Sequence, residues 1–255
     1  MKRITKILIV ALAIALVAAA CGGGDSLEGR EVTVGVENLY PPFNFIDEAT
    51  GEGAGFDYDI WNEICERLDC TAVFVEAGWP AVIEETGQGV YDTAADGISI
   101  NEKRKEVVAF SDPYMTTIQK FMVRGDESRF TTSDEFIAGD YILATQVGTT
   151  NELLGNELVG TDRMEAYDSF PVAVQALLSG DVDAVIIDDV AGQGYQGANA
   201  DQLSLLEGDL QSDPLGFIYP HDSDLIESVN KIIADMKSDG TLEDLIKKWF
   251  IDFDA

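Results

Sequence analysis

The chain has 255 residues, of which 47 are acidic and 16 are basic, so its net charge is −31. Such an excess of acidic residues excludes the basic surface that binding to nucleic acid or to anionic lipid headgroups requires. The hydrophobic content of 46% is enough to build substantial cores, and the length predicts one large domain or two smaller ones.

The first twenty residues have the features of a secretion signal. Lys2, Arg3 and Lys6 precede an unbroken apolar run over residues 7–20, which ends in three alanines. A basic start, an apolar segment and small residues at its end are typical of a signal peptide, and the run is short for a membrane-spanning helix. We therefore predict that residues 1–20 are removed and that the remainder is exported as a soluble protein.

The small residues before Cys21 resemble the lipobox of bacterial lipoproteins. The resemblance implies cleavage before Cys21 and attachment of lipid to it, which would hold the protein on the outer side of the cell membrane. The alternative is an ordinary signal peptide with an incidental cysteine. Residues 21–29 begin with a glycine-rich stretch and are predicted to form a flexible tether.

Two further cysteines, Cys65 and Cys70, flank the point where a predicted helix ends and a strand begins. In an oxidising compartment such a pair favours a disulfide, with two free buried thiols as the alternative. A metal site is not favoured, because the one histidine, His221, lies far along the chain and no zinc-ligand spacing is present. We expect no metal or other cofactor.

Strand and helix patterns alternate along the remainder of the chain, which predicts an α/β layered fold. The expected strands are short apolar or alternating runs at 30–36, 71–75, 92–100 (with a loop), 141–145, 184–187 and 216–219. The expected helices cover 57–68, 79–86, a segment starting near 149, 170–178, 222–237 and 241–249. No Pro- or Ser-rich linker divides the halves, which favours two lobes joined by short strands.

Motifs for catalysis are weak in this sequence. His221 sits in a Pro-His-Asp turn, and pairs of carboxylates arise by chance in so acidic a chain. Residues 192–197 match G-x-G-x-x-G, but Asp188 and Asp189 separate them from the preceding strand and would repel phosphate. We therefore exclude a dinucleotide site there.

The segment from Asp96 to Arg104 is more informative. A loop of small residues exposes backbone groups and the Ser99 hydroxyl, and a helical turn then presents Arg104. The planar guanidinium suits bidentate binding of a carboxylate. A surface arginine paired with a local acid is the alternative.

A series of short motifs, in this order and spacing, resembles the polar amino-acid branch of the extracellular solute-binding proteins that serve ABC importers. The resemblance spans residues 30–250, and the motifs that carry it are Tyr40-Pro41-Pro42-Phe43, Gly55–Ile60, Trp79, Gly97-Ile98-Ser99 with Arg104, Phe110–Tyr114, Val147–Thr150, Asp183-Ala184 with Asp188, and Asp239–Thr241 through Trp249-Phe250. Some relatives also carry a disulfide near the position of Cys65 and Cys70, with a longer spacing.

The resemblance implies a two-lobe periplasmic-binding-protein-like fold of type II. Residues 30–117 and 216–255 would form lobe 1, and residues 118–212 would form lobe 2. Two short hinge strands, near 116–118 and 213–216 (with 213–215 in the second crossing), would join the lobes. Binding of a ligand would close them.

The resemblance also assigns roles to the ends of a zwitterionic ligand. Arg104 would bind its α-carboxylate, with donors from Ser99, from Thr149 or Thr150 and from the start of the helix there. Asp188 would accept the α-ammonium, and the carbonyl of Gly97 would share that role.

The ligand's side chain would lie between Tyr40 and Trp79. Two further acids distinguish this chain, Asp96 at a position where several relatives have a small hydroxyl residue, and Glu37 where some place an acid that contacts the ligand's side chain. If both face the cleft, they favour a cationic amino acid, namely arginine, lysine or histidine. If they face solvent, glutamine or another neutral polar amino acid is equally favoured.

The sequence thus predicts a monomeric binding protein without enzymatic activity, which captures a polar amino acid and delivers it to an ABC permease. The alternative is a cyclohexadienyl dehydratase on the same fold, in which Glu37 or Asp96 would donate a proton to a prephenate- or arogenate-like acid.

Overall fold

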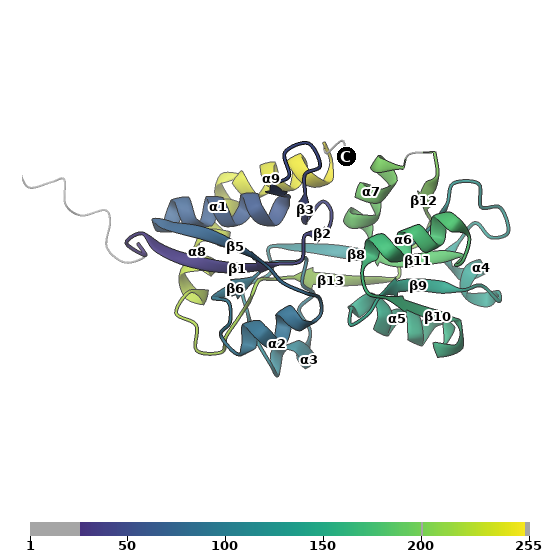
Figure 1. Cartoon of the computed structure of the whole chain (residues 1–255), viewed down its shortest axis with the longest axis horizontal. Coiled ribbons are helices and arrows are strands. Elements are labelled where there is room, and N and C mark those ends of the chain that lie inside the picture. The colour runs from purple at the N-terminus through teal and green to yellow at the C-terminus, as the bar shows by residue number, and fades with distance from the viewer. Residues whose placement is uncertain (1–25, 200, 253–255) are drawn as a thin grey trace, which may run out of the picture.

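The computed structural model describes residues 26–199 and 201–252 (Figure 1). The predicted signal peptide and Cys21 lie outside these residues. Within the described part, no helix combines the length and the apolar character that crossing a membrane requires.

Lobe 1 is built on a five-stranded sheet in the order β5-β1-β6-β14-β7. Its strands are β1 (Arg30–Val36), β5 (Cys70–Glu76), β6 (Thr93–Ala94), β7 (Ala109–Phe110) and β14 (Ile218–Tyr219). Its helices are α1 (Phe56–Leu68), α2 (Ala81–Gly87), α3 (Glu102–Lys105), α8 (Ile226–Asp239) and α9 (Thr241–Phe250). Figure 1 shows α1 and α9 above this sheet and α2 and α3 below it. A small sheet of β2 (Leu39–Tyr40), β3 (Asn44–Ile46) and β4 (Gly53–Ala54) lies beside it.

The apolar pattern of the sequence explains the core of lobe 1. Val32, Val34 and Val36 of β1 are fully buried, and β1 pairs in parallel with β5 along its whole length. The buried residues of α1 recur at the spacing of one helical face, with Ile60 and Ile64 fully buried.

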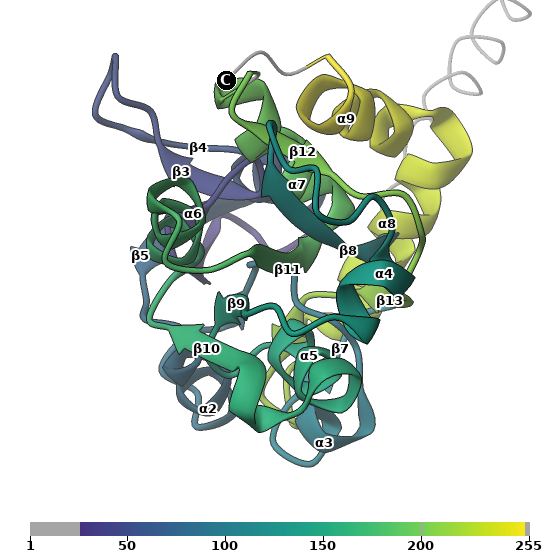
Figure 2. The same cartoon turned by 90° about the vertical axis from the view of Figure 1, so that its right-hand side faces the viewer.

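Lobe 2 is built on a six-stranded sheet in the order β10-β9-β11-β8-β12, with β13 also paired to β8. The strands are β8 (Met115–Arg124), β9 (Leu143–Gln146), β10 (Met164–Tyr167), β11 (Ala184–Asp188), β12 (Leu203–Leu205) and β13 (Gln211–Leu215). The helices are α4 (Ser133–Ala138), α5 (Thr150–Val159), α6 (Phe170–Ser179) and α7 (Asp189–Ala198), with a 3₁₀ turn at Thr161–Arg163. Figures 1 and 2 place α5 and α6 on opposite faces of this sheet.

The strands β8 and β13 connect the two lobes (Figure 1). They pair antiparallel, with Met115 opposite Leu215 and Gln119 opposite Gln211. Both segments predicted as hinge crossings lie on or next to this paired stretch, so the two crossings run side by side.

The disulfide predicted between Cys65 and Cys70 is present and joins the last turn of α1 to the first residue of β5. Asp69 turns the chain between them in a left-handed backbone conformation. Close by, Leu27 and Gly29 donate backbone hydrogen bonds to the carbonyls of Leu68 and Asp69. The tether predicted over residues 21–29 is therefore too long, because residues 27–29 are bound to lobe 1.

Some elements differ from the sequence prediction. The strand expected within 92–100 has two residues, and the helix expected from 222 begins at Ile226. The stretch after Asp188 forms helix α7, which the glycines concealed. Gly192 and Gly194 lie inside this helix, where side chains of Leu205 and Pro42 come so close that a Cβ would have little room. The first two glycines of the G-x-G-x-x-G match therefore allow close packing, whereas a Cβ at the third, Gly197, would meet no atom within 4 Å.

Candidate functional site

A cavity lies between the lobes, and the structure gathers every predicted ligand-binding residue around it. Its lining surrounds about 310 Å³ of space that is not filled by atoms, part of which is open to solvent. The predicted residues in its lining are Glu37, Tyr40, Trp79, Asp96, Gly97, Ser99, Arg104, Thr149, Thr150 and Asp188. Gln146, Asn151 and Phe170 complete the lining and were missed from the sequence.

The cavity forms where strands of both sheets end. Glu37 follows β1 and Asp96 follows β6 in lobe 1, while Gln146 and Asp188 are the last residues of β9 and β11 in lobe 2. In open α/β sheets the carboxyl ends of the strands leave a crevice in which ligands bind. The topology therefore brings residues from distant parts of the sequence to one place.

Arg104 is buried at one side of the cavity without a carboxylate partner. Among the described residues, its guanidinium donates one hydrogen bond, of 2.9 Å, to the carbonyl of Ser99 and lies 5.0 Å from the centre of the Trp79 ring. Burial lowers the pKa of Arg104 to about 10, although Asp188 and Asp213 oppose the shift. The side chain is not a surface arginine paired with a local acid, since it is 9% exposed and keeps donors free for an anion.

Glu37 and Asp96 both face the cavity and are 7% and 4% exposed. Glu37 accepts a hydrogen bond of 2.6 Å from Gln146 of the opposite lobe, and burial together with Asp96 raises its pKa to about 8. Burial also raises the pKa of Asp96 to about 7, against the opposing effects of Asn44 and Arg104. The alternative in which these acids face solvent is therefore wrong.

Asp188 lines the same cavity and is 3% exposed. It accepts hydrogen bonds from the Tyr40 hydroxyl at 3.0 Å and from the Asn151 amide at 3.2 Å. Burial raises its pKa to about 7. One of its oxygens is thus held by a donor from lobe 1 and the other by a donor from lobe 2.

The two aromatic residues expected on either side of the ligand's side chain both line the cavity, in different surroundings. Tyr40 stacks on Phe43 and Phe170, with ring centres 5.2 and 5.0 Å apart. Trp79 instead packs against Arg104 and donates from its indole nitrogen to the carbonyl of Val147. Tyr40 therefore contributes a hydroxyl next to Asp188 as well as a ring, a role that the sequence did not reveal.

The start of α5 supplies further donors. Thr149 caps this helix by accepting from the amide of Glu152 at 3.0 Å, and Thr150 lies 3.1 Å from Ser99 of lobe 1, hydroxyl to hydroxyl. The carboxylate of Glu152 accepts a hydrogen bond from the backbone N–H of Gly148. In a capping box it would accept from the N–H of the N-cap residue, which is Thr149 here. Gly97 has a left-handed backbone (φ 55°), and a Cβ there would come within 3.1 Å of Tyr40.

Charge complementarity in this cavity suits a small zwitterion with an added positive group. One guanidinium and three carboxylates line the cavity, and both lobes contribute residues to its lining. Among residues 26–199 and 201–252, no group of three or more histidine, cysteine or acidic side chains is placed to hold a metal ion.

Known proteins of similar sequence include a family of binding proteins and individual members of it. The model of the bacterial extracellular solute-binding proteins, family 3, matches residues 32–252. The histidine-binding periplasmic protein of Salmonella typhimurium is 30% identical over 236 residues, which cover 89% of each chain. The L-cystine-binding protein TcyJ of Escherichia coli is 28% identical over 226 residues, 88% of this chain and 84% of that one.

Solved structures extend the likeness to the fold. The arginine-, lysine-, histidine-binding protein ArtJ of Geobacillus stearothermophilus superposes with a TM-score of 0.80 at 26% identity, over 87% of this chain and 95% of that one. The two-lobe arrangement expected from the sequence is confirmed. This chain belongs to family 3 of the bacterial extracellular solute-binding proteins.

Proposed function

We propose that the protein captures a polar amino acid, with a cationic one favoured, between its lobes outside the cytoplasm and delivers it to the permease of an ABC importer. The observation that carries this proposal is the interlobe cavity, in which a buried and unpaired Arg104 faces three buried carboxylates. The named relatives bind histidine, cystine, or arginine, lysine and histidine, which supports an amino acid as the ligand.

The two ends of the ligand would meet groups from both lobes. Its α-carboxylate would accept from Arg104, Ser99 and Thr150, and it would lie near the start of α5, where free amides favour an anion. Its α-ammonium would donate to Asp188, whose position Tyr40 and Asn151 already fix.

The side chain of the ligand would carry a positive charge. With Arg104 and Asp188 assigned to the two ends, Glu37 and Asp96 remain, and both are buried. Two carboxylates in a site with little water are unfavourable without a positive partner. A guanidinium or ammonium between them would relieve that cost, whereas a neutral side chain would leave them protonated.

Closure of the lobes would follow from bonds that cross the cavity. Gln146 donates to Glu37 and Tyr40 donates to Asp188, each from the opposite lobe. A ligand would replace or complete such bonds and favour the closed arrangement, and β8 and β13 provide two paired strands about which the lobes would turn.

A thermal-shift screen of the purified protein against the twenty amino acids and citrulline tests the proposal. A ligand at 100 times its dissociation constant adds about 2.7 kcal/mol of stability. For a protein of this size that corresponds to a rise in Tm of about 5–10 °C. We expect arginine, lysine or histidine to give the largest rise; no shift with any amino acid would contradict the proposal.

The dehydratase alternative is not favoured, because the named relatives are binding proteins. Incubation with prephenate and arogenate, followed by an assay for phenylpyruvate and phenylalanine, should detect no product.

A further inference from the structure

Asn44 lies directly behind the cavity and is fully buried at the start of β3. Its amide nitrogen donates to the carboxylate of Asp96 at 2.7 Å and to that of Asp57 at 2.9 Å. Its carbonyl oxygen accepts from the backbone N–H of Asn38 at 2.6 Å. One side chain that does not line the cavity thus contacts Asp96 and the residue next to Glu37.

The orientation of this amide is fixed by its partners. A backbone N–H donates and a carboxylate accepts, so the oxygen of Asn44 must face Asn38 and its nitrogen must face the two acids. An aspartate at this position would place a third carboxylate beside Asp57 and Asp96 and would lose both donors. The pattern therefore requires an amide.

The first turn of α1 supports Asn44 from the other side. Asp57 is fully buried, and burial raises its pKa well above the ordinary range. The neighbouring Tyr58 hydroxyl donates to the side-chain oxygen of Asn38 at 2.8 Å. Asn38 has a left-handed backbone (φ 64°) in the turn that carries Glu37. The turn and the Asp96 carboxylate are thus fixed to one helix through Asn44 and Asn38.

We infer that Asn44 is a positioning residue for charge selectivity, which holds the carboxylates of Glu37 and Asp96 toward the ligand's side chain without touching the ligand. The inference rests on the proposed function, because selectivity for a positive side chain is what the two acids would provide. Loss of the amide would let Asp96 turn or take up a proton, and the turn at Asn38 would lose its acceptor.

Arginine and its neutral isostere citrulline measure this role, because they differ in charge and little in shape. In Asn44→Ala, calorimetry should show arginine binding weakened by about tenfold, the equivalent of one hydrogen bond to a charged group. Citrulline binding should change by less than about threefold, so the preference for arginine should fall. A variant that merely weakened the fold would lose both ligands alike.

Thr93→Val provides the matched control. Thr93 is fully buried in the same lobe and donates to the carbonyl of Ile218 at 2.9 Å, outside the cavity lining. This variant should keep the wild-type ratio of the two affinities. If Asn44→Ala does not give the wild-type circular dichroism spectrum, Asn44→Ser replaces it in the same measurements.

The ionisation of Asp96 gives a second readout that needs no ligand. The groups that act on this carboxylate are Asn44, Arg104, Glu37 and Asp57. Because the hydrogen bond from Asn44 favours the ionised form, its loss should raise the titration midpoint of Asp96, followed by the carboxyl ¹³C resonance, above about 7.

The outcomes separate the two proposals. A wild-type protein that binds arginine no more tightly than citrulline overturns the cationic ligand, and the selectivity role of Asn44 with it. A wild-type preference for arginine that survives in the Asn44 variant, with the Asp96 midpoint unchanged, overturns the role of Asn44 alone.

Discussion

At the scale of single residues, the main feature of the cavity is that its carboxyl groups have raised pKa values. Burial is the largest cause of the raised pKa of Glu37, Asp96 and Asp188, and for Glu37 the neighbouring Asp96 adds to it. A carboxyl group whose pKa is higher in the folded than in the unfolded protein stabilises the fold while it is protonated. The cavity therefore links pH both to stability and to ligand affinity.

The unliganded protein should become less stable as the pH rises from about 5 to about 8.5. In this window Glu37, with a pKa of about 8 in the fold against 4.5 in the unfolded chain, binds a proton that the unfolded chain has lost. Urea unfolding at pH 6 and pH 8.5 measures the difference, and Glu37→Gln should reduce it. Equal stability at the two pH values would show that Glu37 does not titrate in this way.

The affinity for a cationic amino acid should depend on pH with the opposite sign. Protonation of Glu37 and Asp96 below their pKa values of about 8 and 7 removes the charges that the ligand would meet. We expect arginine to bind about tenfold more weakly at pH 6 than at pH 8, and citrulline to change little. Calorimetry at both pH values, in buffers of matched ionic strength, checks this; tighter binding of arginine at pH 6 would contradict it.

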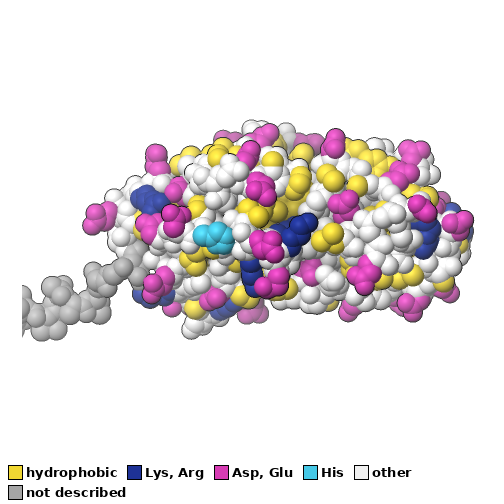
Figure 3. All heavy atoms as spheres, turned by 90° about the horizontal axis from the view of Figure 1, so that it is seen from below, with side chains coloured by type: hydrophobic (Ala, Val, Ile, Leu, Met, Phe, Trp, Pro, Cys, Tyr) yellow, Lys and Arg dark blue, Asp and Glu magenta, His cyan; other side chains and the backbone are white. Residues whose placement is uncertain are grey.

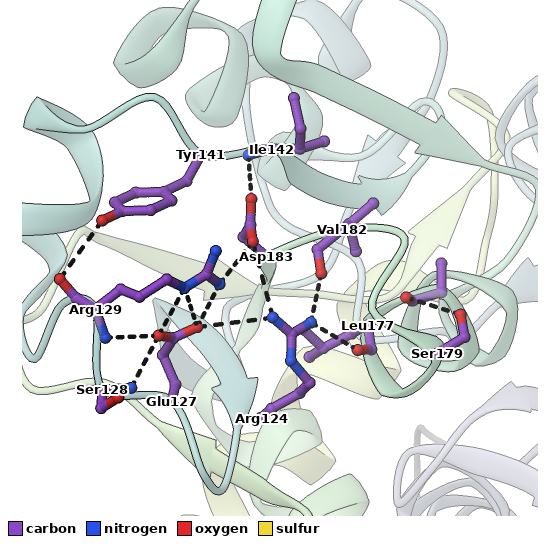
Figure 4. Close-up of polar contacts among 11 residues, drawn as sticks. Arg124, Glu127, Ser128, Arg129, Tyr141, Ile142, Leu177, Ser179, Val182 and Asp183 are labelled. Atoms are coloured by element: carbon purple, nitrogen blue, oxygen red, sulfur yellow. Dashed lines mark hydrogen bonds and ion pairs between the residues drawn. The ribbon is translucent and has the colours of Figure 1, made fainter.

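At the scale of elements, a polar network holds the far end of lobe 2 together (Figure 4). Arg124, at the end of β8, donates to the carbonyls of Leu177 in the last turn of α6 and of Val182 just before β11. Arg129 binds the carboxylates of Glu127 and Asp183 at 2.5 and 2.7 Å. The network joins the ends of three elements, and backbone amides of Ser128, Arg129 and Ile142 also donate to its carboxylates.

Arg124→Ala should destabilise the protein by about 1–3 kcal/mol, the cost of leaving a partly buried acceptor, the carbonyl of Val182, without its donor. Lys120→Ala is a suitable control on the same strand, since Lys120 pairs with Asp209, whose side chain is 67% exposed, and such pairs contribute little. Urea unfolding of both variants measures the difference. Equal effects would mean that the network has no special role.

The sequence predicted the elements whose apolar spacing is regular and missed those whose spacing is not. Helix α1 and strands β1 and β5 are close to their expected bounds. Helix α7 was missed because its glycines lower helix propensity, and its close packing against other elements needs them. Strand β8 was missed because its buried face begins with two polar residues, Thr117 and Gln119, so its first half lacks an apolar alternation.

The site was predictable where motifs carry it and not where tertiary contacts do. The resemblance supplied Arg104 and Asp188, and both line the cavity. Gln146 ends a buried strand just before a recognised motif, and that position was a usable signal. Phe170 and Asn44 gave none, because their roles arise only when segments distant in the sequence meet.

At the scale of the whole molecule, acidic side chains are spread widely and not gathered at one place. On the face in Figure 3 they are scattered over the full length, while lysine and arginine occur in a few positions.

We propose that one lobe comprises residues 30–117 with 216–255, and that the other comprises residues 118–212. Two sheets with separate strand orders and one pair of connecting strands support this division.

A lipid anchor would place this molecule beside a permease in the membrane. We propose that Cys21 becomes the acylated N-terminus and that a short tether connects it to Leu27, the first residue with a backbone bond to lobe 1 in the described part. Mass spectrometry of protein extracted from membranes should find acyl chains on Cys21. An unmodified N-terminus at another residue would contradict the anchor.

The central claim is that the interlobe cavity binds an amino acid through Arg104, and calorimetric titration of Arg104→Ala with the strongest ligand tests it most directly. Loss of a buried charged partner costs about 3–5 kcal/mol, so the affinity should fall by about 100-fold or more. Arg67→Ala, which removes an arginine paired with Glu63 and Asp239 on the surface of the same lobe, should bind as the wild type does. A loss of less than about threefold in a folded Arg104→Ala protein would contradict the account.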